Sequence, residues 1–272
     1  MKAPFTYYGG KMSMAPRIVD LMPAHRVYIE PYLGSGAVFF AKPPATVEIV
    51  NDVDDAIVAF FRALRDTPDE LERVCRLSPY ARAEFDTCAD LTSDMTDLER
   101  ARRFWVRVNQ SFAKTARART GWSVTTARTQ STANSVLGRL GRLEAAAARL
   151  MAVCVEHCDA ADLVDRMATP DTLIYADPPY LATTRSAGAN DYRSDMGTED
   201  DHRRLAKALH ATEASVILSG YPSPLYDELY GDWNVVDTPV LVHSSNATTA
   251  ARAARTERLW LNYEPTEGRL LA

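Results

Sequence analysis

The tetrapeptide Asp177-Pro178-Pro179-Tyr180 constrains this chain more than any other feature, because it directly follows a short β-prone run, Thr172-Leu173-Ile174-Tyr175. In an open α/β sheet, ligands bind beyond the carboxyl ends of the strands, so the tetrapeptide falls where a site is expected. The two prolines fix the backbone and remove two N–H donors, which leaves carbonyl groups free to accept hydrogen bonds. A carboxylate and a carbonyl there are able to hold an exocyclic amino group, and the tyrosine offers a ring face for stacking. The alternative is a rigid turn without a ligand.

A glycine-containing turn follows an earlier β-prone run, Val27-Tyr28-Ile29. Its sequence is Glu30-Pro31-Tyr32-Leu33-Gly34-Ser35-Gly36, and glycines at such a place let the backbone come close to a ligand. A single Gly-x-Gly is weak support, because tight turns use the same residues. The turn therefore needs a second feature to indicate a binding site.

Asp52 supplies that feature, since it comes 18 residues after Gly34 and ends the next β-prone run, Val47–Val50. An acid at this distance is where a doubly wound fold binds a ribose diol, although Asp52 is equally suited to cap a helix. Phe39 replaces the third glycine of the dinucleotide fingerprint. The pattern disfavours nicotinamide and flavin cofactors and suits an adenosyl ligand without phosphates.

The order of elements predicts an α/β fold with a mixed sheet. A helix with Ile57, Phe60, Phe61 and Leu64 on one face follows Asp52, and another is expected over Glu199–Ala211. Further strands are expected at Met151–Val155, Ser215–Leu218, Asn234–Val242 and Arg258–Tyr263, the late ones forming an antiparallel edge.

An inserted, mostly helical lobe is expected over residues 66–151, with the core formed by residues 1–65 and 152–272. Apolar residues recur at helical spacing from Leu98 to Phe112 and again from Val136 to Leu150, where a cap is expected near Asn134 or Ser135. The intervening segment, Ala113–Ala133, is rich in Thr, Ser and Arg and is typical of an exposed basic loop or β-hairpin.

Charge is distributed unevenly along the chain, whose net charge is −5. The segment from Arg100 to Arg149 contains eleven Lys and Arg residues against one acid, Glu144, so it carries +10 and the remainder carries −15. This asymmetry predicts a phosphate-binding surface on the lobe, the alternative being a set of solvated helix faces.

The remaining composition predicts an ordinary intracellular enzyme. No apolar run approaches the ~18 residues of a membrane span, and the first residues lack the apolar stretch of a signal peptide, so a cytoplasmic location is expected. Cys154, His157 and Cys158 lack a fourth ligand with zinc-site spacing, so we expect no metal site and free buried thiols.

Taken in order, these segments resemble the Dam-like family of DNA adenine-N6 methyltransferases. The series begins with Tyr7-Tyr8-Gly9-Gly10-Lys11, continues with the Glu-Pro-x-x-Gly-x-Gly turn, Asn51-Asp52 and the inserted lobe, and reaches Asp-Pro-Pro-Tyr. It extends through Ser219-Gly220-Tyr221 to the segment Thr256–Tyr263. The resemblance implies a Rossmann-like methyltransferase core that uses S-adenosylmethionine, and double-stranded DNA as the substrate.

The resemblance also implies roles for individual residues. The catalytic motif is expected at Asp177, Pro178, Pro179 and Tyr180. The residues expected to form the donor site are Tyr8, Lys11, Glu30, Pro31, Tyr32, Gly34, Gly36, Asp52 and Asp159. Asp52 is expected to bind the ribose, and Asp159 is expected to lie near the adenine amino group. Candidate DNA contacts in the lobe are Lys114, Arg117, Arg119, Trp122 and Arg128.

Three alternatives remain open from sequence. A cytosine-N4 or RNA-base methyltransferase shares the motif, and a catalytically silent nucleic-acid-binding module retains the fold. For adenine in duplex DNA, the amino group is not accessible within the stack, so the base is expected to be flipped and stacked against Tyr180. The resemblance also admits a partner restriction endonuclease, which the sequence neither requires nor identifies.

Overall fold

A mixed β-sheet forms the centre of the computed structural model, which describes residues 1–7, 9–91, 94–112, 114–116, 120–124, 132–181, 196, 198–241 and 254–265. Over these residues the sheet has seven strands in the order β3-β2-β1-β4-β5-β7-β6. Their bounds are β1 (Val27–Glu30), β2 (Val47–Asn51), β3 (Cys154–Glu156), β4 (Thr172–Ala176), β5 (Ser215–Gly220), β6 (Asn234–Leu241) and β7 (Ala254–Leu261).

The first five strands of that order run parallel, and β7 is antiparallel to both of its neighbours, β5 and β6. The predicted mixed sheet with an antiparallel edge is therefore confirmed. Two predicted strand starts are wrong: β3 begins at Cys154, after a turn at Met151, and β7 begins at Ala254 rather than Arg258. From β1 the chain proceeds to one side through β2 and β3, and later to the other side through β4 and β5. This reversal marks the place where an open sheet binds ligands.

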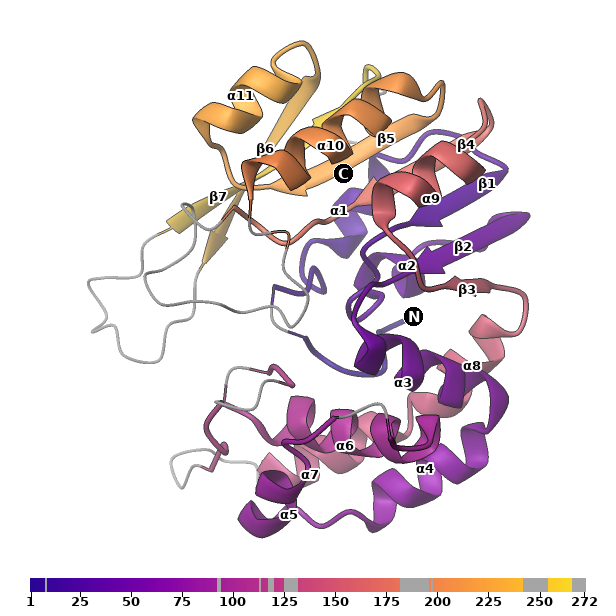
Figure 1. Cartoon of the computed structure of the whole chain (residues 1–272), viewed down its shortest axis with the longest axis vertical. Helices are drawn as coiled ribbons and strands as arrows, with labels where there is room; N and C mark the ends of the chain where they lie inside the picture. The colour runs from indigo at the N-terminus through magenta and orange to yellow at the C-terminus, as the bar shows by residue number, and fades with distance from the viewer. Residues whose placement is uncertain are drawn as a thin grey trace.

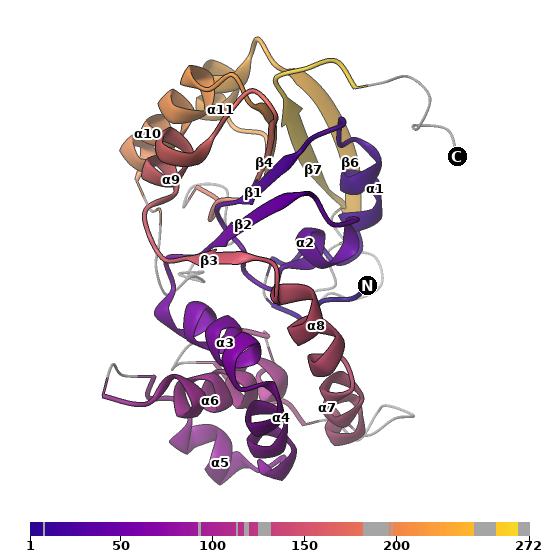
Figure 2. The same ribbon diagram turned by 90° about the vertical axis from the view of Figure 1, so that its right-hand side faces the viewer.

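Helices cover both faces of the sheet, as Figure 2 shows. One face carries α1 (Ala15–Asp20) and α2 (Ala37–Ala41), and the other carries α9 (Ala160–Met167), α10 (Glu199–Ala211) and α11 (Pro224–Tyr230). Adjacent strand residues point to opposite faces, so Tyr28 and Leu173 belong to the first layer of core whereas Ile29 and Ile174 belong to the second.

Among the described residues, six helices lie between β2 and β3 in sequence, and they gather beyond one edge of the sheet (Figure 1). They are α3 (Asp55–Asp66), α4 (Pro68–Leu77), α5 (Arg82–Thr87), α6 (Asp97–Gln110), α7 (Thr132–Leu140) and α8 (Leu143–Leu150). The single helix predicted over Val136–Leu150 is wrong. The structure has two helices separated at Gly141 and Arg142, where glycine weakens the helix, and the first begins at Thr132 instead of near Asn134.

The helical segment shares its apolar core with the first face of the sheet. Helix α3 starts at its N-cap Asp54, whose side chain accepts a hydrogen bond from the Ala56 amide, and places Phe60 and Phe61 inside. The Phe60 ring is 5.0 Å from that of Phe5 and stacks on Trp105 at 6.1 Å. Aromatic contacts therefore join the N-terminal segment, α3 and α6. Within the described ranges, no helix is long and apolar enough to cross a membrane.

Candidate active site

A cavity with about 690 Å³ of empty space opens at the carboxyl ends of β1, β2 and β4. Of the residues predicted for the site, the structure brings seven to its lining: Lys11, Glu30, Tyr32, Gly34, Asp52, Asp177 and Pro179. Pro31, Gly36, Pro178 and Tyr180 lie beside lining residues in the chain, and Tyr8 lies outside the described residues.

The glycine turn after β1 requires its glycines. Gly34 and Gly36 have φ values of 51° and 68°, a region that L side chains rarely adopt. A Cβ atom on Gly36 would also lie 2.9 Å from the Phe40 ring. The backbone of the turn therefore needs glycine at both positions, and the absence of side chains there leaves space at the cavity wall.

Asp52 holds this turn from the neighbouring strand. One carboxylate oxygen accepts a 2.8 Å hydrogen bond from the Gly34 amide, and the other accepts one of 2.9 Å from the Asp54 amide. Burial raises the pKa of Asp52 to about 7, even though these two hydrogen bonds favour the ionised form. Asp52 therefore serves as a structural support of the turn and also faces the cavity.

Asn51, immediately before it, ties three strand ends together. Its side-chain amide donates to the carbonyl of Pro31 (2.8 Å) and to that of Cys158 (3.0 Å), and its oxygen accepts from the Cys158 amide (2.9 Å). Sequence reasoning assigned Asn51 no role of its own. A polar residue that ends an apolar strand is the signal that pointed to one.

Lys11 is the centre of a buried polar cluster on the other side of the cavity. Its ammonium nitrogen lies 2.9 Å from Asp177 Oδ1, 2.8 Å from Glu257 Oε1, 2.6 Å from the Tyr180 hydroxyl and 3.1 Å from the Gly9 carbonyl oxygen. Burial alone lowers the pKa of Lys11, but the negative charges of Asp177 and Glu257 raise it well above its ordinary value. The lysine is therefore charged, and it joins the N-terminal segment to β4 and β7.

Asp177 has a pKa of about 6, raised by burial against the opposing effect of Lys11. Glu257 adds a further negative charge nearby, while hydrogen bonds from Lys11 and Ser219 favour the ionised form. Asp177 thus changes its charge close to neutral pH.

Glu257 is a site residue for which no role was predicted from sequence. It belongs to β7 and is 5% exposed, and besides Lys11 it accepts hydrogen bonds from the Tyr180 hydroxyl and from Ser219 Oγ (3.4 Å). Glu257 shares a strand face with Leu259 and Leu261, and an acid on that apolar face was the available signal.

Glu30 is buried at the end of β1 and accepts a 2.6 Å hydrogen bond from the Tyr28 hydroxyl. Burial raises its pKa to about 8, so its carboxyl group is mostly protonated at neutral pH. The cavity therefore combines one uncharged acid with a charged lysine.

Two buried hydroxyl groups in the cavity lining, Ser35 Oγ and the Tyr175 OH, have no hydrogen-bond partner among the described residues. Buried polar groups are nearly always hydrogen-bonded, so these two indicate polar groups of a ligand. Gly10 keeps this part of the cavity open, because a Cβ there would lie 2.9 Å from the Tyr7 carbonyl oxygen and 3.4 Å from Ser35 Oγ. The lining thus fits a polar ligand that comes close to backbone.

Asp159 lies outside this lining. It caps α9 by accepting from the Ala161 and Asp162 amides, and its other oxygen accepts from Arg204 at 3.0 Å. Burial raises the pKa of Tyr32, and the charges of Asp159 and Asp52 raise it further, so Tyr32 lies near both acids. The role predicted for Asp159 beside an adenine amino group stays a prediction.

In the segment predicted as an exposed loop or β-hairpin, Trp122 forms an isolated antiparallel bridge with Ser111, which lies just before that segment. The Trp122 indole donates to Gln110 Oε1 at 3.2 Å and packs 5.5 Å from the Tyr80 ring, and the Lys114 ammonium donates to the Asn109 carbonyl at 3.2 Å. The DNA contacts predicted at Lys114 and Trp122 therefore stay predictions, and Arg117, Arg119 and Arg128 lie outside the described residues.

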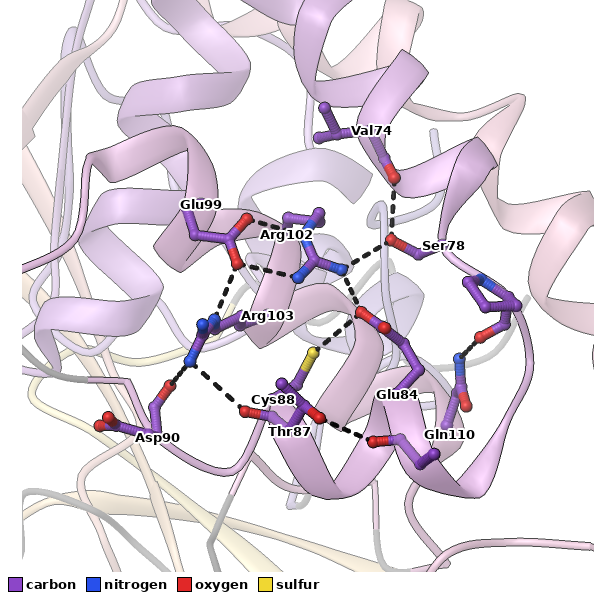
Figure 3. A network of polar contacts seen from close by, with 12 residues as sticks. Val74, Ser78, Glu84, Thr87, Cys88, Asp90, Glu99, Arg102, Arg103 and Gln110 are labelled. Carbon is purple, nitrogen blue, oxygen red and sulfur yellow. Dashed lines mark hydrogen bonds and ion pairs between the residues drawn. The ribbon is translucent and has the colours of Figure 1, made fainter.

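The basic segment is less free than its +10 charge suggests. Arg102 and Arg103 bind Glu99, and Arg102 also binds Glu84, as Figure 3 shows. Arg107 is buried on the Phe85 ring. Glu84 and Glu99 precede the segment that carries the +10 charge, so this value overstates the positive field of the described lobe.

The four cysteines are free thiols. Cys75 and Cys88 are buried as predicted, but Cys154 is exposed, because β3 is the edge strand of the sheet. No group of three or more metal-ligating side chains is found in the described part of the chain.

Comparison with known proteins agrees with the family resemblance of the sequence. Residues 7–243 match the family described as D12 class N6 adenine-specific DNA methyltransferase. The type II methyltransferase M1.LlaDCHI of Lactococcus lactis subsp. cremoris is 26% identical over 283 residues, covering 96% of this chain and 95% of the relative.

Solved structures show only a distant likeness. Precorrin 8W decarboxylase of Methanobacterium thermoautotrophicum aligns over 97% of this chain and 100% of its own, with 8% identity and a TM-score of 0.43. A Thermoplasma acidophilum protein aligns over 88% of this chain and 78% of its own, with 8% identity and a TM-score of 0.39.

Proposed function

The chain belongs to the D12 class of N6 adenine-specific DNA methyltransferases, and we propose that it transfers the methyl group of S-adenosylmethionine to an adenine flipped out of duplex DNA. One observation carries the proposal: Asp177, at the end of β4, lines the same cavity as the glycine turn and Asp52. The group that would hold the target amino group and those that would hold an adenosyl ligand thus face one space.

The donor site is proposed around the glycine turn. Asp52 binds the ribose hydroxyls, Tyr8 and Lys11 contact the donor, and Gly34 and Gly36 border it. The unpartnered hydroxyls of Ser35 and Tyr175 support this assignment, because the donor's amino-acid part offers a carboxylate and an ammonium group for such partners. When bound, S-adenosylmethionine supplies an electrophilic methyl group.

The target site is proposed around Asp177. The adenine amino nitrogen is a poor nucleophile, because its lone pair is delocalised into the ring. Two acceptors, the Asp177 carboxylate and the Pro178 carbonyl, would bind both amino hydrogens and favour a more tetrahedral nitrogen. Positioning and electrostatics then provide most of the rate enhancement.

Base flipping follows from access. The amino group is not reachable within stacked duplex DNA, so the enzyme extrudes the nucleotide into the cavity, where Tyr180 offers a ring for stacking. In the structure this ring lies 4.5 Å from the Tyr221 ring, which makes the two tyrosines one aromatic wall beside Asp177.

Nucleoside mass spectrometry tests the proposal directly. Purified enzyme is incubated with duplex DNA of mixed sequence and S-adenosylmethionine, beside Asp177→Ala and the matched control Asp171→Ala, whose carboxylate is exposed at the other end of β4. We expect N6-methyladenine from the wild type and the control only. N4-methylcytosine as the product, or an active Asp177→Ala enzyme, would contradict the proposal.

The similarity to a type II methyltransferase supports a role in restriction–modification. We propose that the lobe selects a defined DNA site and that a restriction endonuclease recognises the same site. Sequencing of N6-methyladenine in DNA from a methylation-free host that expresses the enzyme tests this. Methylation spread over unrelated sequences would contradict site selection.

A further inference from the structure

Glu257 is surrounded by groups of the site although it lies beyond residues 7–243, which match the family. Strand β7 inserts between β5 and β6, and this places Glu257 beside Lys11 and Tyr180. The side chain has no apolar packing role there, because its oxygen is used by three polar donors: Lys11, Tyr180 and Ser219.

The hydrogen bonds of Lys11 present a conflict for the reaction. An ammonium group donates three hydrogen bonds, and four oxygens surround it: those of Asp177, Glu257, Tyr180 and Gly9. The Asp177 carboxylate, which the proposed mechanism needs as an acceptor for the adenine amino group, is bonded through Oδ1 to Lys11 in this structure, so the lysine and the base would share one carboxylate.

We propose that Glu257 is a positioning residue that retains Lys11 and fixes the Tyr180 hydroxyl, so that Asp177 is released to accept the amino group of the target adenine. This inference rests on the proposed function. When Asp177 turns to the substrate, Lys11 keeps three acceptors, one of them the charged Glu257. Without Glu257, Asp177 is the single carboxylate partner of Lys11 in the cluster. Lys11 then competes with the target adenine for the Asp177 carboxylate.

The pH dependence gives a readout that a merely structural role would not change. The titratable and polar groups around Asp177 come from every neighbouring element: Lys11, Glu30, Tyr175, Ser219, Tyr226 and Glu257, with the Tyr180 hydroxyl bonded to the same Lys11. The charge of Glu257 raises the pKa of Asp177. Removal of that charge should therefore move the acidic limb of the rate profile to lower pH.

The test compares Glu257→Gln and Glu257→Asp in the full chain. The measurements are kcat and KM for duplex DNA between about pH 5 and pH 8, and the Kd of S-adenosylhomocysteine by calorimetry. Glu228→Gln is the matched control, because Glu228 is an exposed acid on α11 that pairs with Arg203 on α10.

We expect Glu257→Gln to lower kcat/KM for DNA by about tenfold or more, which is the usual cost of losing a hydrogen bond to a charged group. The Kd of S-adenosylhomocysteine should change much less than kcat/KM, because Asp177 and Tyr180 still hold Lys11 beside the donor site, and the acidic limb should move down in pH. Glu257→Asp keeps the charge, so its limb should stay in place while its shorter side chain lowers kcat/KM. Glu228→Gln should leave the rate profile unchanged.

Two results overturn the inference. In the first, Glu257→Gln has the same kcat/KM for DNA and the same acidic limb as the control Glu228→Gln. The other is a loss of S-adenosylhomocysteine affinity in proportion to the loss of kcat/KM, which means that Glu257 only shapes the cavity. If Glu257→Gln does not fold, unchanged kinetics in Glu257→Asp also overturn it. A wild type that forms no N6-methyladenine contradicts the proposed function itself, before any variant is compared.

Discussion

Arg149, in the last turn of α8, forms a buried ion pair with Glu48 on β2, one of its contacts being 2.6 Å long. The Arg149 guanidinium also stacks on the Phe39 ring, and Lys42 forms a second ion pair with Glu48. This pair connects the end of the helical segment to the sheet beside the glycine turn. It is the only contact in this region where a charge of the lobe is matched by a carboxylate of the sheet, among the residues that the structure describes.

Arg149→Ala should therefore lower the free energy of unfolding by about 2 kcal/mol, because it removes hydrogen bonds to a buried charge while Lys42 still pairs with Glu48. Urea denaturation measures the loss. Arg166→Ala is the control, since Arg166 pairs with Glu156 on the surface and should cost less than about 1 kcal/mol. Equal losses in the two variants would contradict a buried role for Arg149.

Asp177 should give the enzyme an acidic limit. Its raised pKa of about 6 means that the carboxylate is ionised above that pH and protonated below it. We expect kcat/KM for DNA to fall about tenfold per pH unit below about pH 6, as for one essential base. Initial rates between about pH 5 and pH 8 test this, with circular dichroism to confirm that the protein stays folded. A flat profile would show that the ionised carboxylate is not needed.

Glu30 should make the protein less stable as pH rises. Its pKa is 4.5 in the unfolded chain and about 8 when buried, so folding takes up a proton between these values. Stability is then lost with rising pH across this window, by up to about 1.4 kcal/mol per unit, and the loss ends above pH 8. Glu30→Gln removes this dependence. Urea unfolding at several pH values should give a flatter curve for the variant than for the wild type, and two parallel curves would contradict the buried pKa.

Asp52→Asn should weaken donor binding. Both carboxylate oxygens accept backbone N–H groups, and an amide can replace only one of them, so its NH₂ group would face the Gly34 or Asp54 amide. We expect the Kd of S-adenosylhomocysteine to rise by about tenfold or more. Asp55→Asn, an exposed change in the first turn of α3, serves as the control. An unchanged Kd would exclude Asp52 from the donor site.

The lobe arginines should separate into two groups by the salt dependence of DNA binding. Arg102 is occupied by Glu99 and Glu84, so Arg102→Gln should leave the salt slope unchanged. Arg119, predicted to contact DNA, should reduce the slope by about one when changed to Gln if it binds a phosphate. Fluorescence anisotropy over a range of salt concentrations measures both. The opposite ranking would contradict the assignment.

The architecture was largely predictable from local patterns. Short β-prone runs located the strands, and the apolar face of Ile57, Phe60 and Leu64 located α3. Periodicity failed between Val136 and Leu150, because the apolar spacing continues through Gly141 although the helix does not. Strand ends such as that of β7 were also missed, since hydrogen-bonded register and not residue preference determines where an antiparallel pair begins.

The site was predictable only where a motif carries its own geometry. The turn at Gly34 and the acid at Asp52 are joined by a hydrogen bond that their spacing anticipates. Glu257 could not be placed in the same way, because its proximity to Lys11 depends on the insertion of β7 between β5 and β6. The charge of the lobe was misjudged for a similar reason: Glu84 and Arg102 are distant in sequence and adjacent in space.

The strand order has a consequence for synthesis on the ribosome. Strand β6 is made before β7, but β7 occupies the position next to β5, so β6 has no partner in the sheet until β7 arrives. A nascent chain that has already folded β1 to β5 therefore holds Lys11 and Asp177 without their partner Glu257. Methylation competence should begin abruptly, when residues 254–261 emerge from the exit tunnel, and ribosome-stalled chains of increasing length would reveal that moment.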